Sequence, residues 1–427
     1  MPVLRVLGGG GEVGRAAVLL SDKGNLLLDY GINFDEADRP RFPLHVRPVD
    51  LTAVAISHAH LDHSGAAPLL FTTSSVRVIA TPPTIEAMGL LVMDFLKLNG
   101  PYVDYELTDF EKLRNSAMTM NYGEKADLEG FEVTLSNAGH LIGSSMIYVE
   151  TPSGLRVLYT GDVNDIQTWT LSGADILPAK VDVLIMESTY GARNHPPRNA
   201  VEKAFVEAVD SVTSAGGTVL VPAFSIGRAQ EVAAMIVSQL PHLDVYVDGM
   251  ARNFFPMYAK YDKYVRDPYL IDHVFKSIRF VRSPRERRKV SSVERGCVII
   301  SPAGMLKGGP SVEYVRRLGG DPKNAVLLVS YQAPNSPGHK LLEEGLLDPQ
   351  EGDRLKARLE WYDLSSHAGM EGLLRLAHSY RGTLKSIVLI HGDDDNRLAL
   401  AKKLREELGS DLEVHVPRSG DEIKIEG

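Results

Sequence analysis

Three histidines and one aspartate lie within six consecutive residues near the start of the chain. They are His58, His60, Asp62 and His63, and they directly follow the apolar run 51–56. Side chains alternate along an extended chain, so His58 and His60 point to the same side. A turn after them brings Asp62 and His63 to a second point close by. Zinc accepts imidazole nitrogen and carboxylate oxygen at roughly 2.0–2.2 Å. The chain has only 13 histidines in 427 residues, so the cluster predicts a site for two adjacent metals rather than a histidine-rich surface turn.

Ionisable side chains follow short, apolar, β-rich runs at six places in the chain. These residues are Asp29, His58, His140, Asp162, Glu187 and His391. Chemistry is commonly carried by loops that a rigid scaffold holds at strand ends. The pattern therefore predicts that the six groups meet at one rim of a sheet system.

The middle of the chain has a different pattern, because it alternates amphipathic helical stretches with strands. Apolar residues recur at helical spacing over 199–213, and a second helix is predicted over 228–239. Strands are predicted at the following places: 218–221, 245–247, 298–300 and 325–329. Such alternation favours an α/β domain with a largely parallel sheet. The last stretch, from about 361, returns to the first pattern and offers one more helix over 396–408.

The composition is that of an ordinary globular protein, with 44% apolar and 24% charged residues. Cys297 is the single cysteine, which excludes internal disulfides and fits a reducing cytosol. No run of 18 apolar residues occurs and the first residues do not form a signal peptide, so we expect a cytoplasmic protein without a membrane span.

The net charge of −9 is unusual for a protein that binds nucleic acid. Bound divalent metals or a local basic patch would supply the missing positive charge. Segment 282–289 is the best local candidate, with five basic residues against one acid. It is either a solvated helix face or a phosphate contact.

A glycine-rich segment at 9–14 satisfies the pattern G-x-G-x-x-G, and Asp29 lies 20 residues after Gly9. A dinucleotide site would need a helix after these glycines. The chain instead places two apolar runs around S-D-K-G at 21–24, which is typical of a hairpin. We interpret the glycines as a tight turn near the site.

Taken together, the H-x-H-x-D-H motif, His140, Asp162 and His391 resemble the metallo-β-lactamase superfamily. Glu187 in M-E-S-T-Y-G and His367 in S-S-H-A-G resemble motifs A and B of its β-CASP group, with His391 as motif C. The resemblance covers nearly the whole chain. It implies an α/β fold: a metallo-β-lactamase αββα sandwich with an inserted α/β β-CASP domain that caps the site. Residues 1–192 would form the first part of the sandwich, 193–360 the β-CASP domain, and 361–427 the closing, RNA-metabolising part.

The resemblance also implies a role for each motif residue. One Zn²⁺ would be held by His58, His60 and His140, and a second by Asp62, His63 and His391. Asp162 would bridge the two ions, and Asp29 would orient a metal-binding histidine. Two metals about 3.5–4 Å apart activate a water for attack on phosphorus. The catalytic groups would be His367 as proton donor to the leaving oxygen, Glu187 as its partner, and Asp62.

Further expectations concern the substrate strand. The resemblance places the strand in a cleft between the two domains, where phosphate contacts are expected from Ser301, Gly304 and Ser366. Residues 301–309 resemble the small-residue loop of the family, whose backbone N–H groups approach an anion. Segment 330–339 departs from the family pattern through its prolines, which would alter substrate fit. We also expect that no RNA-binding extension precedes the nuclease fold.

The function that the resemblance implies is a two-zinc ribonuclease that cleaves single-stranded RNA, of the mRNA 3′-end-processing endonuclease type. Histidine at motif C favours RNA over DNA. A 5′→3′ exoribonuclease of the RNase J type is the first alternative. A catalytically weak scaffold subunit and a small-molecule metallohydrolase are the alternatives from other classes. A homodimer, formed through the closing domain, and an RNA-decay or processing complex are possible assemblies.

Overall fold

The computed structural model describes residues 1–293, 295–348, 353–409 and 412–425. The chain forms two compact units. The first unit comprises Met1–Gln167, Gly173–Asn194 and Ser366–Gly427, and the second comprises Thr168–Ser172 and His195–Ser365. The second unit is thus an insertion into the first. Its boundaries lie a few residues from those expected at 192 and 360, and it also includes five residues that the sequence placed with the first part.

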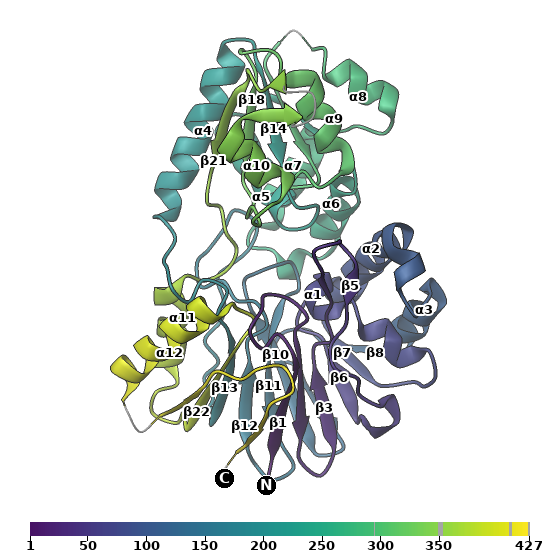
Figure 1. The fold of residues 1–427 in the computed structure, drawn as a ribbon, viewed down its shortest axis with the longest axis vertical. Coiled ribbons are helices and arrows are strands. Elements are labelled where there is room, and N and C mark those ends of the chain that lie inside the picture. Colours follow the sequence, from purple (N-terminus) through teal and green to yellow (C-terminus); the bar gives the residue numbers. More distant parts are fainter. Residues whose placement is uncertain (294, 349–352, 410–411, 426–427) are drawn as a thin grey trace. The chain divides into compact units, whose positions relative to one another are not determined.

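Two seven-stranded sheets build the first unit. The first sheet has the order β24 (Glu422–Lys424), β1 (Val3–Gly8), β2 (Ala17–Ser21), β3 (Asn25–Leu28), β6 (Ala53–Ala55), β7 (Val78–Ala80) and β8 (Ala117–Thr119). The second has the order β23 (Glu413–His415), β22 (Ser386–Ile390), β13 (Val183–Glu187), β12 (Arg156–Tyr159), β11 (Ser145–Glu150), β10 (Phe131–Asn137) and β9 (Lys125–Leu128). The closing segment contributes three of these strands. One of them, β24, pairs with β1, which brings the two ends of the chain together (Figure 1).

The core of the first unit lies between the two sheets, as strand β12 illustrates. Val157 and Tyr159 point into the apolar layer shared by both sheets, whereas Leu158 points to the opposite face. That outer face is covered by α11 (Met370–Ser379) and α12 (Asp394–Leu408). Helices α2 (Pro82–Asn99) and α3 (Leu107–Asn115) lie beside the first sheet (Figure 1). The layers are therefore helix, sheet, sheet and helix. Each buried Leu or Val in them contributes about 1.5–3 kcal/mol.

The second unit is built on one six-stranded sheet. Its order is β16 (Arg279–Phe280), β15 (Asp244–Val247), β17 (Cys297–Ser301), β14 (Thr218–Pro222), β18 (Ala325–Leu328) and β21 (Arg358–Trp361). Every neighbouring pair is parallel, as the alternating sequence pattern predicted. One face packs against α4 (Arg198–Ser214), α5 (Arg228–Gln239), α6 (Ala251–Lys260) and α7 (Pro268–Ser277). The other packs against α8 (Pro284–Val290), α9 (Gly309–Leu318) and α10 (Pro337–Glu344).

Short elements complete both units. They are α1 (Leu61–Ser64), β4 (Asn33–Phe34), β5 (Pro40–Arg41), β19 (Leu346–Asp348), β20 (Asp353–Arg354), and the 3₁₀ turns Pro48–Asp50, Ala67–Phe71, Gly100–Tyr102 and Asp262–Tyr264. Strands β2 and β3 form the hairpin predicted around 21–24. The glycines at 9–14 lead into β2 rather than a helix, so the dinucleotide pattern is a turn. Among the described residues, no helix is long and apolar enough to cross a membrane.

Candidate metal centre

The six strand-end residues lie at one rim of the first unit. They follow or end β3, β6, β10, β12, β13 and β22. These strands run in the same direction within their sheets, so their carboxyl ends share an edge. The structure therefore brings together groups that are more than 300 residues apart in the sequence, such as His63 and His391, whose Nε2 atoms lie 3.2 Å apart.

Three histidines gather around the Asp162 carboxylate on the side of its Oδ2 atom, and the four side chains form one possible metal-binding group. The group consists of His58, His60, His140 and Asp162. Asp162 Oδ2 lies 3.5 Å from His58 Nε2 and 3.6 Å from His140 Nε2. His60 Nδ1 lies 3.2 Å from His140 Nε2. Two imidazole nitrogens that face each other this closely are typical of ligands that share a cation.

Three further side chains gather around the same carboxylate on the side of its Oδ1 atom, and with Asp162 they form a second possible metal-binding group. It consists of Asp62, His63, Asp162 and His391. Asp162 Oδ1 lies 3.2 Å from His63 Nε2, and Asp62 Oδ2 lies 3.3 Å from His391 Nε2. The one-turn helix α1 carries Asp62 and His63 away from His58 and His60, so neighbours in the sequence belong to different groups.

The two groups fit a pair of tetrahedral cations. Ligands at about 2.0–2.1 Å from a tetrahedral zinc lie about 3.4 Å from one another, and the distances between ligand atoms here range from 3.2 to 3.6 Å. The donor set is also incomplete without a cation. His58 Nε2 and Asp162 Oδ1 are buried and have no hydrogen-bond partner among the described residues. Buried polar atoms are normally paired, so these two atoms are available to bind a metal.

The outer nitrogens of the histidines are held by the surrounding structure. His63 donates from Nδ1 to Asp29 Oδ2 at 2.6 Å, and His140 donates from Nδ1 to the Ser366 carbonyl at 2.8 Å. His391 Nδ1 lies 3.2 Å from the Thr189 hydroxyl. In each case the partner fixes the orientation of the ring. Nε2 of all three rings faces the cluster, and His391 Nδ1 also lies 3.3 Å from Asp162 Oδ1. Ser366 thus meets the site through its backbone.

Asp29 is the most heavily bonded carboxylate of the rim. It is fully buried, and besides His63 it accepts hydrogen bonds from the Ser57 amide, the Ser57 hydroxyl and the Tyr159 hydroxyl at 2.6–2.7 Å. Its backbone adopts a left-handed conformation with φ of 57°. Strained conformations of this kind persist where the surrounding structure holds them. Asp29 therefore connects both sheets to the orientation of one histidine.

Burial and neighbouring charges set the protonation of the cluster. Burial and the nearby charge of His63 hold the pKa of His58 well below its ordinary value, and burial does the same for His140 beside His367. Both rings are therefore neutral at pH 7, which is the form of imidazole that binds a metal. Burial also disfavours the charged form of His63, but the carboxylates of Asp162 and Asp29 outweigh it and raise its pKa. Burial likewise opposes ionisation of Asp62, and its bond to His391 nevertheless keeps its pKa low.

Glu187 and His367 form a separate pair at the edge of the cluster. His367 donates from Nδ1 to Glu187, 3.0 Å from Oε1 and 3.1 Å from Oε2. The Val163 amide holds Glu187 Oε1 at 2.8 Å. His367 Nε2 lies 3.9 Å from Asp162 Oδ2. Burial lowers the pKa of His367, but the charges of Glu187 and Asp162 outweigh it and raise the pKa to about 9. The imidazolium is therefore the stable form at neutral pH.

Two glycines allow the loops of the rim to approach this closely. Gly161 precedes Asp162 with φ of 54°, and a Cβ on it would lie 2.6 Å from Ser57 Cβ. Gly139 precedes His140 with φ of 73°, and a Cβ there would overlap the Asn164 carbonyl. Only glycine adopts a positive φ without strain and also has no Cβ that would overlap these neighbours.

Comparison with known proteins assigns the family. Three family descriptions match the chain: the metallo-beta-lactamase superfamily over residues 10–176, the Beta-Casp domain over 229–341, and the Zn-dependent metallo-hydrolase RNA specificity domain over 352–417. The RNase aCSPSF2 of Saccharolobus solfataricus is 42% identical over 99% of this chain and 85% of its own length. The chain belongs to the β-CASP ribonuclease family.

Other relatives of this β-CASP protein cover it almost completely. The probable RNase MJ4 of Methanocaldococcus jannaschii is 32% identical over 97% of the chain and 98% of its own length. The transcription termination factor FttA of Pyrococcus horikoshii is 32% identical over 98% of the chain and 70% of its own length. A crystal structure of a protein of unknown function from Enterococcus faecalis shares the fold, with a TM-score of 0.65 at 14% identity over 99% of both chains.

Sequence reasoning missed several polar groups of this β-CASP site. Ser57, Tyr159 and Thr189 hold Asp29 or a histidine. Their positions next to motif residues were a weak signal, because Ser57 precedes His58 and Tyr159 lies three residues before Asp162. A hydroxyl chooses its partner in the folded state, so the sequence does not identify the bond.

The basic segment 282–289 is partly structural in the β-CASP protein. Arg287 lies 2.6 Å from Asp248 and 2.8 Å from Glu313, and its side chain is largely buried. Arg287 therefore has a structural role, and a phosphate contact by this segment stays a prediction. Ser301 and Gly304 are buried in the second unit, and their contact with a phosphate stays a prediction.

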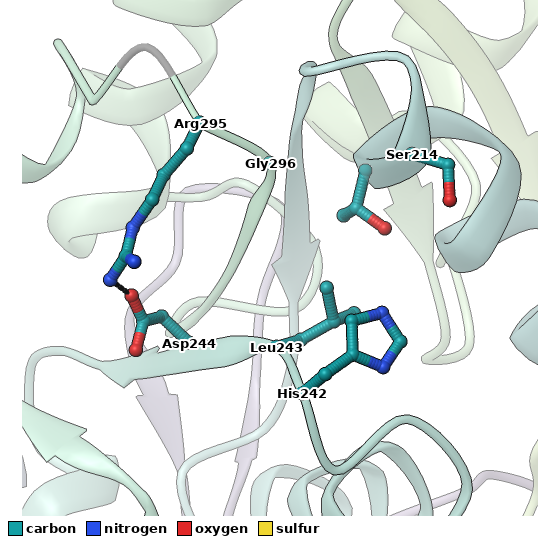
Figure 2. Close-up of a pocket in the computed structure, with 7 residues that line it drawn as sticks. Ser214, His242, Leu243, Asp244, Arg295 and Gly296 are labelled. Atoms are coloured by element: carbon teal, nitrogen blue, oxygen red, sulfur yellow. Dashed lines mark ion pairs between the residues drawn. The ribbon is translucent and has the colours of Figure 1, made fainter.

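A cavity of about 240 Å³ lies at the amino edge of the second unit's sheet. Its lining includes Asp244, which begins β15, and Gly296, which precedes β17. Figure 2 shows Asp244 paired with Arg295 beside it. None of the predicted site residues lines this cavity. The chemistry-bearing groups gather at the rim of the first unit instead.

Proposed function

We propose that the chain is a two-zinc ribonuclease that hydrolyses phosphodiester bonds within single-stranded RNA. One observation carries this proposal: the carboxylate of Asp162 faces one set of three protein ligands with Oδ2 and another set with Oδ1. A carboxylate shared between two ligand sets would hold two cations close together, as two-metal phosphodiester hydrolysis needs. The RNA specificity domain matched over 352–417 supports RNA as the substrate.

The ligand assignment follows the two groups. One zinc would be held by His58, His60, His140 and Asp162, and the other by Asp62, His63, His391 and Asp162. When bound, the two ions supply an activated water at neutral pH and stabilise charge on the phosphate oxygens. Asp29 keeps His63 in the orientation that ligation needs.

His367 and Glu187 provide the proton that the leaving oxygen needs. The imidazolium is held by Glu187 through Nδ1, and Nε2 is the atom that donates. The charges of Glu187 and Asp162 keep the ring protonated against the effect of burial. Divalent cations beside the ring would lower its pKa from about 9 towards neutrality, because like charges disfavour each other. A general acid is most effective near that range, where it contributes about 10²–10⁴-fold.

Other parts of the proposal rest on the relatives and on the resemblance. Relatives of this chain are named as RNases, which supports internal cleavage or decay of RNA. Backbone or hydroxyl groups of Ser301, Gly304 and Ser366 would contact the phosphate. A cytoplasmic location, a homodimer formed through 361–427, and membership of an RNA-decay or processing complex belong to the same proposal.

The test combines metal analysis with RNA cleavage. Purified protein should contain two zinc ions per chain and shorten a labelled single-stranded RNA. The His367→Ala variant should keep both ions and lose cleavage by about 10²-fold or more. His378 is the matched control, because it lies on α11 of the same unit and pairs with Glu407 on the surface. His378→Ala should cleave like wild type. Equal activity of wild type and His367→Ala would refute the assignment.

A further inference from the structure

Three large aromatic side chains are exposed in the second unit where its strands end. Phe224 follows β14, Tyr331 follows β18 and Trp361 ends β21. Their exposed fractions are 37%, 47% and 43%. The chain has only two tryptophans, and one of them stands in solvent here. Neighbouring exposed aromatic residues mark a binding surface, since isolated ones need no explanation but a group does.

The backbone connects these three residues, which we call the aromatic edge. The buried residue Ser330 links two of them, because the Trp361 indole donates to the Ser330 carbonyl at 3.0 Å and Tyr331 is the next residue. Gly304 connects them to Phe224, because a Cβ built on this glycine would lie 2.7 Å from the Ser330 hydroxyl and 3.2 Å from the Phe224 amide nitrogen. The amide of Gln332 donates to the carbonyls of both Gly304 and Ser330, at 2.9 and 3.0 Å. The backbone that presents the rings is therefore tied together.

The topology of the sheet makes this edge a natural binding place. Strands β14 and β17 are parallel neighbours. The helix after β14, α5, packs on one face of the sheet, whereas the helix after β17, α9, packs on the other. In open parallel sheets, ligands bind outside the carboxyl ends of strands where the connections diverge in this way. Phe224 and Gly304 lie in the two diverging loops.

The charge of the edge suits an anionic strand. The three loops 223–227, 302–308 and 329–336 contain no aspartate or glutamate, and they contain Lys307. The chain as a whole has 55 acidic residues and a net charge of −9, so these three loops are a local departure. The acids beside Trp361 are Glu360 and Asp363, and they pair with Arg358 and His195. The helices α5, α9 and α10 begin directly after these loops, and helix amino ends carry partial positive charge. Aromatic faces beside positive potential are what single-stranded nucleic acid binds.

We propose that the aromatic edge stacks the bases of the single-stranded RNA substrate. This inference rests on the proposed function, because it names residues of the second unit that hold that function's substrate. Phe224, Tyr331 and Trp361 offer their ring faces to successive bases. The three loops contain no carboxylate that would repel the adjoining phosphates. A protein partner would favour an apolar surface with complementary charges, whereas rings beside loops that contain no acidic residue favour a polyanion with stacking bases.

Binding measurements on the full-length, zinc-loaded chain test this surface. The His367→Ala background keeps the RNA intact during the measurement. The probes are a labelled oligoadenylate of about 12 nucleotides, within the site sizes usual for single-strand binders, and an abasic strand of the same length and charge. Tyr331→Ala and Phe224→Ala should each weaken oligoadenylate binding roughly ten-fold and leave abasic binding unchanged, and Tyr331→Phe should bind like the background. Tyr269→Ala is the matched control, because Tyr269 is 89% exposed on α7 of the same unit.

The outcomes separate this inference from the proposed function. Unchanged oligoadenylate affinity in folded Tyr331→Ala and Phe224→Ala proteins would overturn the stacking surface, even if the wild type cuts RNA. If Tyr331→Ala and Phe224→Ala lose affinity but the wild type never cuts RNA, the stacking surface would stand and the ribonuclease function would be refuted. Trp361→Ala also removes an indole bond and risks misfolding. Trp361 is therefore kept, and its fluorescence is measured in a Trp169→Phe variant, where it is the single tryptophan. The oligoadenylate should quench this fluorescence and the abasic strand should not.

Discussion

Asp162 decides the character of the site at the scale of single residues. Each of its oxygens faces a different pair of imidazole nitrogens, and burial of the carboxylate is offset by the charges of His391 and His63, which lower its pKa. A buried carboxylate without such partners would be costly. The same side chain therefore couples two ligand groups that the sequence presents in separate motifs.

Replacing Asp162 with asparagine should abolish the shared ligand while keeping its shape. The new side-chain amide would offer one neutral oxygen, so we expect fewer than two zinc ions per chain by elemental analysis and a loss of cleavage of at least about 10²-fold. Asp182→Asn is the matched control, because Asp182 is equally buried in the same unit but pairs with Arg156. Its zinc content should equal that of the wild type. Two tightly bound zinc ions in Asp162→Asn would contradict the shared-ligand assignment.

Replacing Glu187 with glutamine should change the pH dependence of cleavage. The pKa of His367 is raised to about 9, and a reaction that needs the protonated ring is fast below that pKa and slows as the pH rises through it. Glu187→Gln removes the nearest negative charge, so the pKa of His367 falls. The alkaline limb of the single-turnover rate profile should move to lower pH by about one unit or more. Bound zinc should lower the pKa of His367 equally in the wild type and in Glu187→Gln, so the difference between their alkaline limbs should remain. An unmoved limb would rule out His367 as the titrating acid.

At the scale of elements, the strand ends and their turns position the ligands. Asp29 and His391 have left-handed backbones with φ of 57° and 51°, and both lie at the ends of buried strands. The rim therefore holds several residues in conformations that an isolated peptide would avoid. Packing of the two sheets supplies the free energy that maintains them.

Gly161→Ala tests how tightly the turn before Asp162 is packed. A left-handed alanine costs about 1–2 kcal/mol, and contact with Ser57 adds about 1–3 kcal/mol of overpacking. Gly154→Ala is the control, since Gly154 has φ of 84° and no atom near its Cβ position. Urea unfolding should show a larger loss of stability for Gly161→Ala, together with reduced zinc content. Equal losses in the two variants would show that the turn has room to adjust.

The elements also show how far the sequence determines this fold. The helix predicted over 228–239 matches α5, and the parallel sheet of the second unit follows from alternating strands and helices. Ligand residues were identifiable because they form short motifs after apolar strands. The bonds of Ser57 and Tyr159 to Asp29 were not, because they join strands far apart in the sequence. The grouping of Thr168–Ser172 with the second unit was missed for the same reason.

At the scale of the whole molecule, the two units have separate cores. All the proposed ligands lie in the first unit, whereas the second has its own sheet with apolar residues on both faces. Metal binding should therefore stabilise one unit directly and leave the other with its own stability.

Removal of the metals tests that separation. A ligand present at about 1,000 times its dissociation constant stabilises the folded state by about 4 kcal/mol. Chelation should therefore increase hydrogen exchange in the rim loops around 57–64, 139–145 and 160–164. The strands β14 and β17 should keep their protection. Uniform loss of protection over both units would contradict independent cores.

The most direct test of the central claim is the cleavage of a closed circular single-stranded RNA by the zinc-loaded protein. A circle has no 5′ end, so only internal hydrolysis opens it. The two-metal site with His367 as proton donor predicts that wild type converts the circle to linear RNA, and that His367→Ala, with the same zinc content, converts it at least about 10²-fold more slowly. A circle that stays intact while linear RNA is degraded would contradict internal cleavage and favour an exonuclease.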